Sequence, residues 1–151
     1  MTMPVRLGHV AVPAKDPGEL AGFYQQLLGL EVTMTGSVPV LGDFVFLGDR
    51  PTAELPLLAL HTQPEGRHIA LEVESLDALR TLCADAQARG IQIAMALNHR
   101  VSISVYFLDP EGNAVEVYWA TGLKDLDRPY ADPITLEDLR RPASELLERV
   151  G

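Results

Sequence analysis

The sequence is short of several features that define common protein classes. It contains one cysteine, so no disulfide can form within the chain. It has 12 Lys and Arg residues against 21 Asp and Glu, a formal net charge of −9, and no basic cluster that would attract phosphate backbones or anionic lipids. We therefore expect binding neither to nucleic acid nor to a membrane surface.

Long apolar segments are also missing. No run approaches the roughly 20 apolar residues that cross a bilayer, and the N-terminal stretch MTMPVRLGHVAV lacks the layout of a signal peptide. These absences favour a cytoplasmic protein. The 151 residues, 47% of them hydrophobic, suffice for one globular domain with a substantial core. Cys83 shares a helical face with apolar residues, so we expect it to be a buried structural thiol.

What the sequence does contain is an internal repeat. The segment LGHVAVPAKDPGELAGFYQQLLGLEVTM aligns with GRHIALEVESLDALRTLCADAQARGIQIAM, which places His9 on His68 and Asp16 on Ser75. Each copy reads as a strand that begins near a histidine, then a helix, then three short strands. The repeat predicts an α+β fold of two paired βαβββ modules.

The repeat also sets the expected domain boundaries. Module one spans residues 5–62 and module two residues 66–121, within one domain of residues 1–121. Each module has a helix on one face of its sheet, so pairing the two sheets encloses a cleft. Residues 122–151 follow as a Pro-rich arm and a short helix.

The first helix is the best marked element. Asp16 is its predicted N-cap, Pro17 and Glu19 suit its first turn, and Gly29 can end it in the left-handed conformation. A stripe at helical spacing is predicted to face the core. It consists of Leu20, Phe23, Tyr24, Leu27 and Leu28.

Three polar residues interrupt apolar strands. Side chains alternate between the two faces of a strand, and in HVAV, HIALEV and AVEVYW the apolar residues share one face, expected beneath the helices. The opposite face carries His9, His68 and Glu116. Taken singly, either histidine could be an ordinary strand residue hydrogen-bonded to nearby backbone. Glu116 alone could be a residue at a strand edge that faces water. Together, two imidazoles and one carboxylate suit a divalent first-row metal and leave positions for substrate and oxygen.

The segments GHVAV, RHIALEV and YFLDPEGNAVEVYW carry a family resemblance. From residue 5 to about residue 121 the chain resembles the vicinal oxygen chelate superfamily, which includes glyoxalase I, fosfomycin and bleomycin resistance proteins, and extradiol dioxygenases. The resemblance implies paired βαβββ modules around a metal cleft. It also implies that His9, His68 and Glu116 are the metal ligands.

The stretch HRVSISVYFLDPEGNAVE narrows the resemblance. It is similar to the extradiol dioxygenase signature, with His99 and Tyr106 in the His and Tyr slots ahead of the ligand Glu116. Leu97 departs from the signature, which usually has Gly, Asn, Thr or a β-branched residue there. The intervening DPEG favours a type I turn in its own right and indicates the fold, so His99 and Tyr106 are the discriminating residues.

The closest resemblance is to single-domain extradiol enzymes similar to catechol 2,3-dioxygenase. It implies an Fe(II)-dependent dioxygenase that cleaves a catechol-like aromatic with dioxygen. An imidazole commonly titrates near neutrality, so His99 could act as acid and base or stabilise oxygen. Tyr106 could hydrogen-bond a substrate oxygen. Both are predicted catalytic residues, against the alternatives of a surface His and a core Tyr.

Two other functions remain open. A glyoxalase-like isomerase, lyase or thiol transferase would use Mn, Ni, Zn or Mg and usually four ligands. Leu57 occupies the position equivalent to Glu116, but Glu54 or His61 could supply the fourth after a register shift. The third possibility is a metal-free small-molecule-binding protein similar to bleomycin resistance proteins. Superfamily members with one module pair commonly assemble, which implies a homo-oligomer, dimer or higher.

The C-terminal segment departs from the repeat. Thr135 and Asp138 are spaced to cap a short helix, which Pro142 interrupts or kinks. Tyr130, in the preceding arm, could close over the cleft as a lid. The arm could equally pack on a neighbouring subunit.

Overall fold

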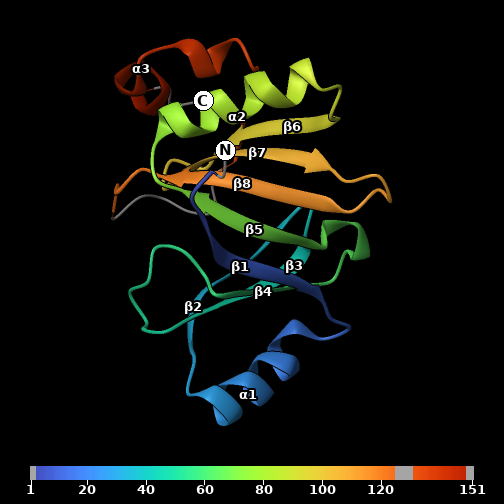
Figure 1. Cartoon of the computed structure of the whole chain (residues 1–151). Coiled ribbons are helices and arrows are strands. Elements are labelled where there is room, and N and C mark those ends of the chain that lie inside the picture. Colours follow the sequence, from blue (N-terminus) through green and yellow to red (C-terminus); the bar gives the residue numbers. More distant parts are fainter. Residues whose placement is uncertain (1–2, 125–130, 149–151) are drawn as a thin grey trace. The chain divides into compact units, whose positions relative to one another are not determined.

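A computed structural model describes residues 3–124 and 131–148 of the chain. It separates into two compact units, Gly8–Ala70 and Met1–Leu7 with Leu71–Gly151. The elements follow the predicted order, strand, helix and three strands, twice over (Figure 1). The predicted α+β fold of two βαβββ repeats is confirmed.

The unit Gly8–Ala70 contains four consecutively paired strands and one α-helix. Its elements are β1 (Val5–Pro13), which belongs to this unit from Gly8, α1 (Pro17–Leu28), β2 (Glu31–Val38), β3 (Gly42–Gly48), β4 (Leu58–His61), and the 3-10 turn η1 (Pro64–Gly66). The strand order is β2-β3-β4-β1, with β1 and β4 parallel and the other pairs antiparallel. Helix α1 packs on β3 and β4 (Figure 1).

Helix α1 begins and ends as its sequence predicts. The Asp16 carboxylate accepts a hydrogen bond of 3.0 Å from the Glu19 amide, which satisfies one free amide of the first turn. Gly29 follows the helix with φ of +68°, and its amide donates to the Gln25 carbonyl. A residue without Cβ takes this left-handed conformation at no steric cost.

The prediction that the whole apolar stripe of α1 faces the core is wrong. Phe23, Leu27 and Leu28 are 55%, 62% and 59% exposed. The helix contacts the sheet through Ala21, with Leu20 and Tyr24 packed beside it. The small Ala21 side chain allows a close approach on that narrow face, which turns the Phe23 and Leu27 side of the helix to solvent.

The second unit repeats the plan and adds the C-terminal segment. Its part of β5 (His68–Val73) begins at Leu71. The elements that follow are α2 (Leu76–Ala88), β6 (Ile93–Asn98), β7 (Ser102–Leu108), β8 (Ala114–Ala120), β9 (Asp132–Ile134), η2 (Asp138–Arg140) and α3 (Ala143–Glu148). The strand order is β5-β8-β7-β6-β9. Helix α2 lies over β7 and β8 (Figure 1).

Alternation along the strands assigns most faces correctly. Val73 and Val117 lie in the core beneath α2, and Val12 packs against the core beneath α1, as predicted. Ile69 does not follow the pattern, since it is 43% exposed. Cys83 is buried among these core residues, and burial raises the pKa of its thiol to about 11. The thiol is therefore unreactive at neutral pH, as expected of a structural cysteine.

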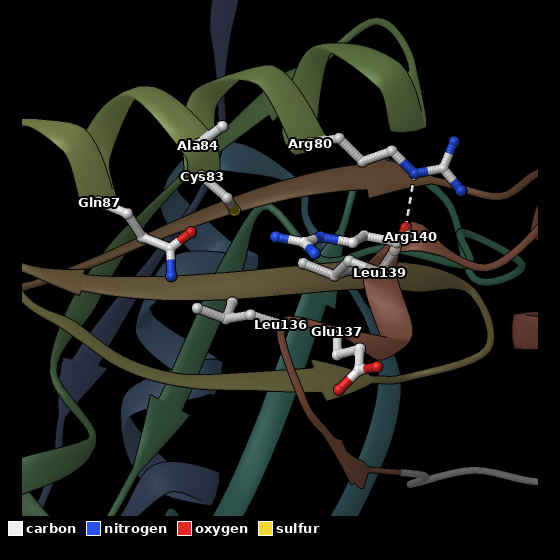
Figure 2. Close-up of a pocket in the computed structure, with 8 residues that line it drawn as sticks. All are labelled: Arg80, Cys83, Ala84, Gln87, Leu136, Glu137, Leu139 and Arg140. Atoms are coloured by element: carbon white, nitrogen blue, oxygen red, sulfur yellow. Dashed lines mark hydrogen bonds between the residues drawn. The ribbon is translucent and has the colours of Figure 1, made fainter.

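The C-terminal segment is anchored to this unit. Thr135 and Asp138 cap each other's backbone amides, and Pro142 separates η2 from α3, so the predicted capping box and interruption are both confirmed. From α2, Arg80 donates to the carbonyl oxygen of Leu139 at 2.5 Å (Figure 2). It also donates to the carbonyl oxygen of Arg141. The predicted lid residue Tyr130 lies outside the described residues.

None of the helices in the described part of the chain combines the length and apolar character needed to cross a bilayer.

Candidate metal centre

His9 and His68 meet within the unit Gly8–Ala70. Their Nε2 atoms are 3.1 Å apart, and their rings lie nearly edge to face with centroids 5.2 Å apart. Both side chains are partly buried. Two imidazole nitrogens this close together on separate strands suit a divalent first-row metal.

Gly66 fixes the tautomer of His68. The Nδ1 atom of His68 lies 2.7 Å from the Gly66 carbonyl oxygen. A carbonyl oxygen only accepts hydrogen bonds, so Nδ1 must carry the proton and Nε2 of the neutral ring keeps its lone pair. This is the arrangement in which metal-binding histidines are commonly held, and it turns the ligand atom of His68 toward His9.

His61 supports the turn that contains Gly66. Its side chain is fully buried, and a Cβ added at Gly66 would lie 3.2 Å from two atoms of its ring. Neither ring nitrogen reaches hydrogen-bond geometry with a described residue. Burial lowers the pKa of His61, although backbone groups of Gln63 and Ala11 partly oppose the shift. His61 is therefore a neutral, packed ring against η1.

Within the described residues of the unit Gly8–Ala70, no third His, Cys, Asp or Glu joins His9 and His68 as a metal-ligand group. The two residues left open as fourth ligands, Glu54 and His61, are therefore not brought to the pair. Leu57, the repeat equivalent of Glu116, is 45% exposed.

Glu116 lies in the middle of β8 in the other unit, and it is only 3% exposed. Its Oε1 atom accepts a hydrogen bond of 2.6 Å from the Ser104 hydroxyl on β7. A buried carboxylate needs such partners because desolvation of the charge is costly. Ser104 also fixes the direction of one carboxylate oxygen.

His99 and Tyr106 lie beside Glu116. Tyr106 is directly opposite Glu116 in the β7–β8 ladder, so both side chains share one face of the sheet. The Nε2 atom of His99 lies 3.3 Å from the Tyr106 hydroxyl and 4.0 Å from Oε1 of Glu116. Both predicted catalytic residues are thus brought to the predicted carboxylate ligand.

The environment keeps the Tyr106 phenol protonated. Burial raises its pKa well above the usual value, and the charge and hydrogen bond of Glu116 raise it further. Both effects disfavour the phenolate. Tyr106 is therefore a neutral hydrogen-bond donor at the pH values at which proteins are handled.

The turn between β7 and β8 sets this register. The Asp109 carboxylate accepts from the amides of Glu111 and Asn113, and the Gly112 amide donates to the Asp109 carbonyl at 2.9 Å. The hydrogen bond from the Asn113 side chain is the main cause of the lowered pKa of Asp109. The predicted DPEG turn is present, and it aligns Tyr106 with Glu116.

Sequence reasoning gave three neighbouring residues no role in orienting the site. Ser104 was recognisable only as a polar residue on the same strand face as Tyr106. His61 was considered only as a possible fourth ligand, and Gly66 gave no signal, because its effect depends on a turn whose carbonyl reaches back to His68. A pocket of about 290 Å³ between α2 and the C-terminal segment contains none of the predicted site residues; Arg80, Cys83 and Arg140 are among the residues that line it (Figure 2).

A sequence model of the Glyoxalase/Bleomycin resistance protein/Dioxygenase superfamily matches residues 6–117. The chain belongs to this superfamily. The resemblance to the vicinal oxygen chelate superfamily is thereby confirmed. No curated protein sequence matches the chain significantly.

Solved structures of this superfamily's fold are similar throughout the domain. A catechol 2,3-dioxygenase superposes with a TM-score of 0.63 at 23% identity, over 89% of this chain and 52% of that one. The Mn(II)-bound glyoxalase from Novosphingobium aromaticivorans gives 0.60 at 25% identity, over 81% and 42%. Streptomyces coelicolor methylmalonyl-CoA epimerase gives 0.58 at 18% identity, over 78% and 98%.

These solved structures differ in length and in the activity that their names state. The chain spans about half the length of the dioxygenases and the glyoxalase that it matches, and nearly all of the epimerase. At these identities the likeness establishes the shared fold. The choice of reaction within the superfamily depends on the residues of the site itself.

Proposed function

We propose that this chain is an Fe(II)-dependent extradiol dioxygenase that cleaves the ring of a catechol-like aromatic. In this proposal the modules of residues 5–62 and 66–121 form the catalytic domain. His9, His68 and Glu116 hold one metal ion, and each offers one ligand atom. The observation that carries the proposal is the placement of His99 and Tyr106 beside the buried Glu116.

The donor set fits such a metal. The Nε2 atom of His68 keeps a lone pair that could bind a metal, because the Nδ1 proton is donated to the Gly66 carbonyl. His9 directs Nε2 to the same point. With the carboxylate of Glu116, the set is two imidazoles and one carboxylate, which leaves open positions in the coordination sphere of non-heme iron. Bound there, Fe(II) would supply the electron transfer that lets dioxygen react with an aromatic ring.

The protein residues around the metal then have separate tasks. Tyr106 is a neutral donor, suited to a hydrogen bond with one substrate oxygen. His99, next to it, can accept a proton from a catechol hydroxyl at Nε2 and return it to the product. Ser104 holds the Glu116 carboxylate in one orientation throughout. The burial of Ser104, Tyr106 and Glu116 excludes water from this face.

The substrate class follows from the same groups. A substrate with two adjacent oxygens on a planar ring would use two open metal positions and the Tyr106 hydroxyl. Dioxygen is the second substrate. We also propose a homo-oligomer, because superfamily members with one module pair commonly assemble.

The test is a reconstitution. The protein is purified without oxygen, loaded with Fe(II), and given a panel of catechols with dioxygen. The expected result is a coloured ring-fission product and matching oxygen uptake, both lost in Glu116→Ala. Glu111→Ala, an exposed carboxylate in the preceding turn, is the matched control and should retain activity. Tight four-coordinate Ni or Zn without oxygen uptake would contradict the proposal.

A glyoxalase-like isomerase or lyase is the second candidate. The fold similarity to a Mn(II)-bound glyoxalase favours it. Such an enzyme would need a metal but no oxygen. Turnover of a panel of hemithioacetals under nitrogen, lost in Glu116→Ala, would establish this alternative over ring cleavage.

A further inference from the structure

Asn98 lies at the junction between the core and the turn that carries His99. It is the last residue of β6, it is fully buried, and it faces Ile103 of the core in the β6–β7 ladder. His99 follows it directly and reaches the Tyr106 hydroxyl. Two consecutive residues therefore connect the core with the candidate site.

Both ends of the Asn98 amide are used. Its Oδ1 atom accepts a hydrogen bond of 2.8 Å from the Arg100 amide. Its Nδ2 atom donates at 2.7 Å to the carbonyl oxygen of Leu146 in α3. The carbonyls of a helix's last turn have no partner within the helix, so Asn98 satisfies one that α3 would otherwise leave buried.

The turn that Asn98 holds has an unfavourable backbone conformation. Arg100 has φ of +65°, the only positive value at a non-glycine residue in the described part of the chain. A side chain with Cβ adopts this conformation only where neighbouring contacts enforce it. Thr121 contributes, since its hydroxyl donates to the Arg100 carbonyl at 2.5 Å and its amide to the Val101 carbonyl at 3.0 Å.

The C-terminal segment also contacts the end of β6, next to the His99 turn. Strand β9 pairs with the end of β6, where Asp132 lies opposite Asn98. Leu146, whose carbonyl accepts from Asn98, is itself fully buried in the core. The position of α3 is therefore fixed by apolar packing, and the Asn98 amide transmits that position to the backbone of the His99 turn.

We propose that Asn98 is a positioning residue that couples helix α3 to the turn carrying His99. The C-terminal segment then acts on the candidate site through the core of its own unit. The inference rests on the proposed function only for the task of His99. Undocking α3 removes the partner of Nδ2, frees the Asn98 amide to rotate, and lets the Arg100 turn relax, which displaces the His99 ring from Tyr106.

The test uses the full-length, metal-free chain and three variants. Leu146→Asp places a carboxylate in the apolar core and should undock α3, while residue 98 remains Asn. Asn98→Ala removes both hydrogen bonds directly. Arg80→Gln is the matched control, because it releases the Leu139 and Arg141 carbonyls of the same segment and leaves Asn98 and Leu146 intact.

Two measurements report on the turn. One is hydrogen exchange of the Arg100 amide, with the Val105 amide of β7 as the reference for global stability. The other is the cross-peak of the His99 ring at one fixed pH. We expect Arg100 protection to fall about 100-fold in Asn98→Ala and about 10-fold in Leu146→Asp relative to Val105. The His99 cross-peak should shift in both variants, and Arg80→Gln should resemble the wild type in both measurements.

The outcomes either support or overturn the coupling between α3 and the His99 turn. An unchanged Arg100 amide in Leu146→Asp, or an equal loss of protection at Val105, overturns the coupling. If Leu146→Asp does not fold, Leu146→Ala is measured against the same two criteria. In the iron-loaded enzyme, Leu146→Asp should lower kcat about 10-fold with little change in KM. If the wild type cleaves no catechol, the proposed function fails, whereas exchange and the His99 cross-peak still decide the coupling.

Discussion

The Nδ1 atom of His68 lies 2.7 Å from the carbonyl oxygen of Gly66, which leaves the Nε2 lone pair of His68 directed at His9. The tautomer of a candidate metal ligand is thus fixed by a backbone turn two residues away. Metal-binding histidines depend on such partners for their orientation and basicity. The stability of the η1 turn and the affinity for metal should therefore change together.

Gly66→Ala tests that connection. The added Cβ would lie 2.9 Å from Cδ2 of Leu41 and 3.2 Å from the His61 ring, so the turn and its carbonyl must shift. We expect about 10- to 100-fold weaker metal binding and about 1–3 kcal/mol lower stability. Gly22→Ala in α1 is the control, since its Cβ meets no atom within 4 Å and the substitution should be neutral or stabilising. Equal metal affinity in the two variants would refute the role of Gly66.

Ser104→Ala should weaken metal binding without unfolding the protein. The substitution removes the 2.6 Å hydrogen bond to Oε1 of Glu116 and frees that buried carboxylate to rotate. Loss of such a supporting contact typically costs about 10- to 100-fold in metal affinity. Ser102→Ala is the matched control, because Ser102 is a buried serine of the same strand that lies opposite Ala120 and not beside Glu116. Calorimetric titration with Fe(II) or Mn(II) compares the variants.

Tyr106→Phe should retain the fold and lose activity. The ring stays in place, but the donor to the substrate is gone, so kcat should fall about 10- to 100-fold. Because burial and Glu116 raise the pKa of Tyr106 well above the usual value of 10.0, the residue should stay protonated where an exposed tyrosine ionises. The tyrosinate absorbance of wild type and variant should therefore coincide on titration from pH 8 to pH 11. A larger wild-type signal would show that Tyr106 ionises in that range.

The lowered pKa of His61 predicts that the free energy of unfolding depends on pH. Burial lowers its pKa below the usual value, so the unfolded chain binds its proton more readily than the folded chain. Its contribution to stability is therefore fully present above the unfolded pKa of about 6.5 and declines as the pH falls below it. In metal-free protein, the difference in unfolding free energy between wild type and His61→Gln should narrow from pH 7.5 to pH 5. Urea denaturation at both pH values measures it, and a constant difference would contradict the assignment.

The sequence predicted the fold wherever local chemistry decides the structure. Asp16 and Gly29 delimit α1 through capping alone, and the DPEG turn fixes the register of β7 and β8 by its own hydrogen bonds. Phe23 and Leu27 were misplaced because helical spacing defines an apolar stripe without saying how wide the contacting sheet is. The small Ala21 determined which face of α1 docks.

The candidate site was predictable to the same extent. His9, His68 and Glu116 could be selected by alternation and by their places in the repeat, and His99 and Tyr106 by a signature. Their supporting residues could not be selected in this way. Ser104 acts across a ladder, Gly66 through a backbone carbonyl and Asn98 through a helix 48 residues away, and such contacts exist only in the folded chain.

The central claim is that His9, His68 and Glu116 bind one metal ion together. Anaerobic dialysis against Fe(II), followed by measurement of bound iron in the wild type and in His9→Ala, His68→Ala and Glu116→Ala, tests it most directly. We expect about one iron per wild-type chain. Each single substitution should remove nearly all of it, while Glu111→Ala should bind as the wild type does. Wild-type iron content in Glu116→Ala would contradict the account.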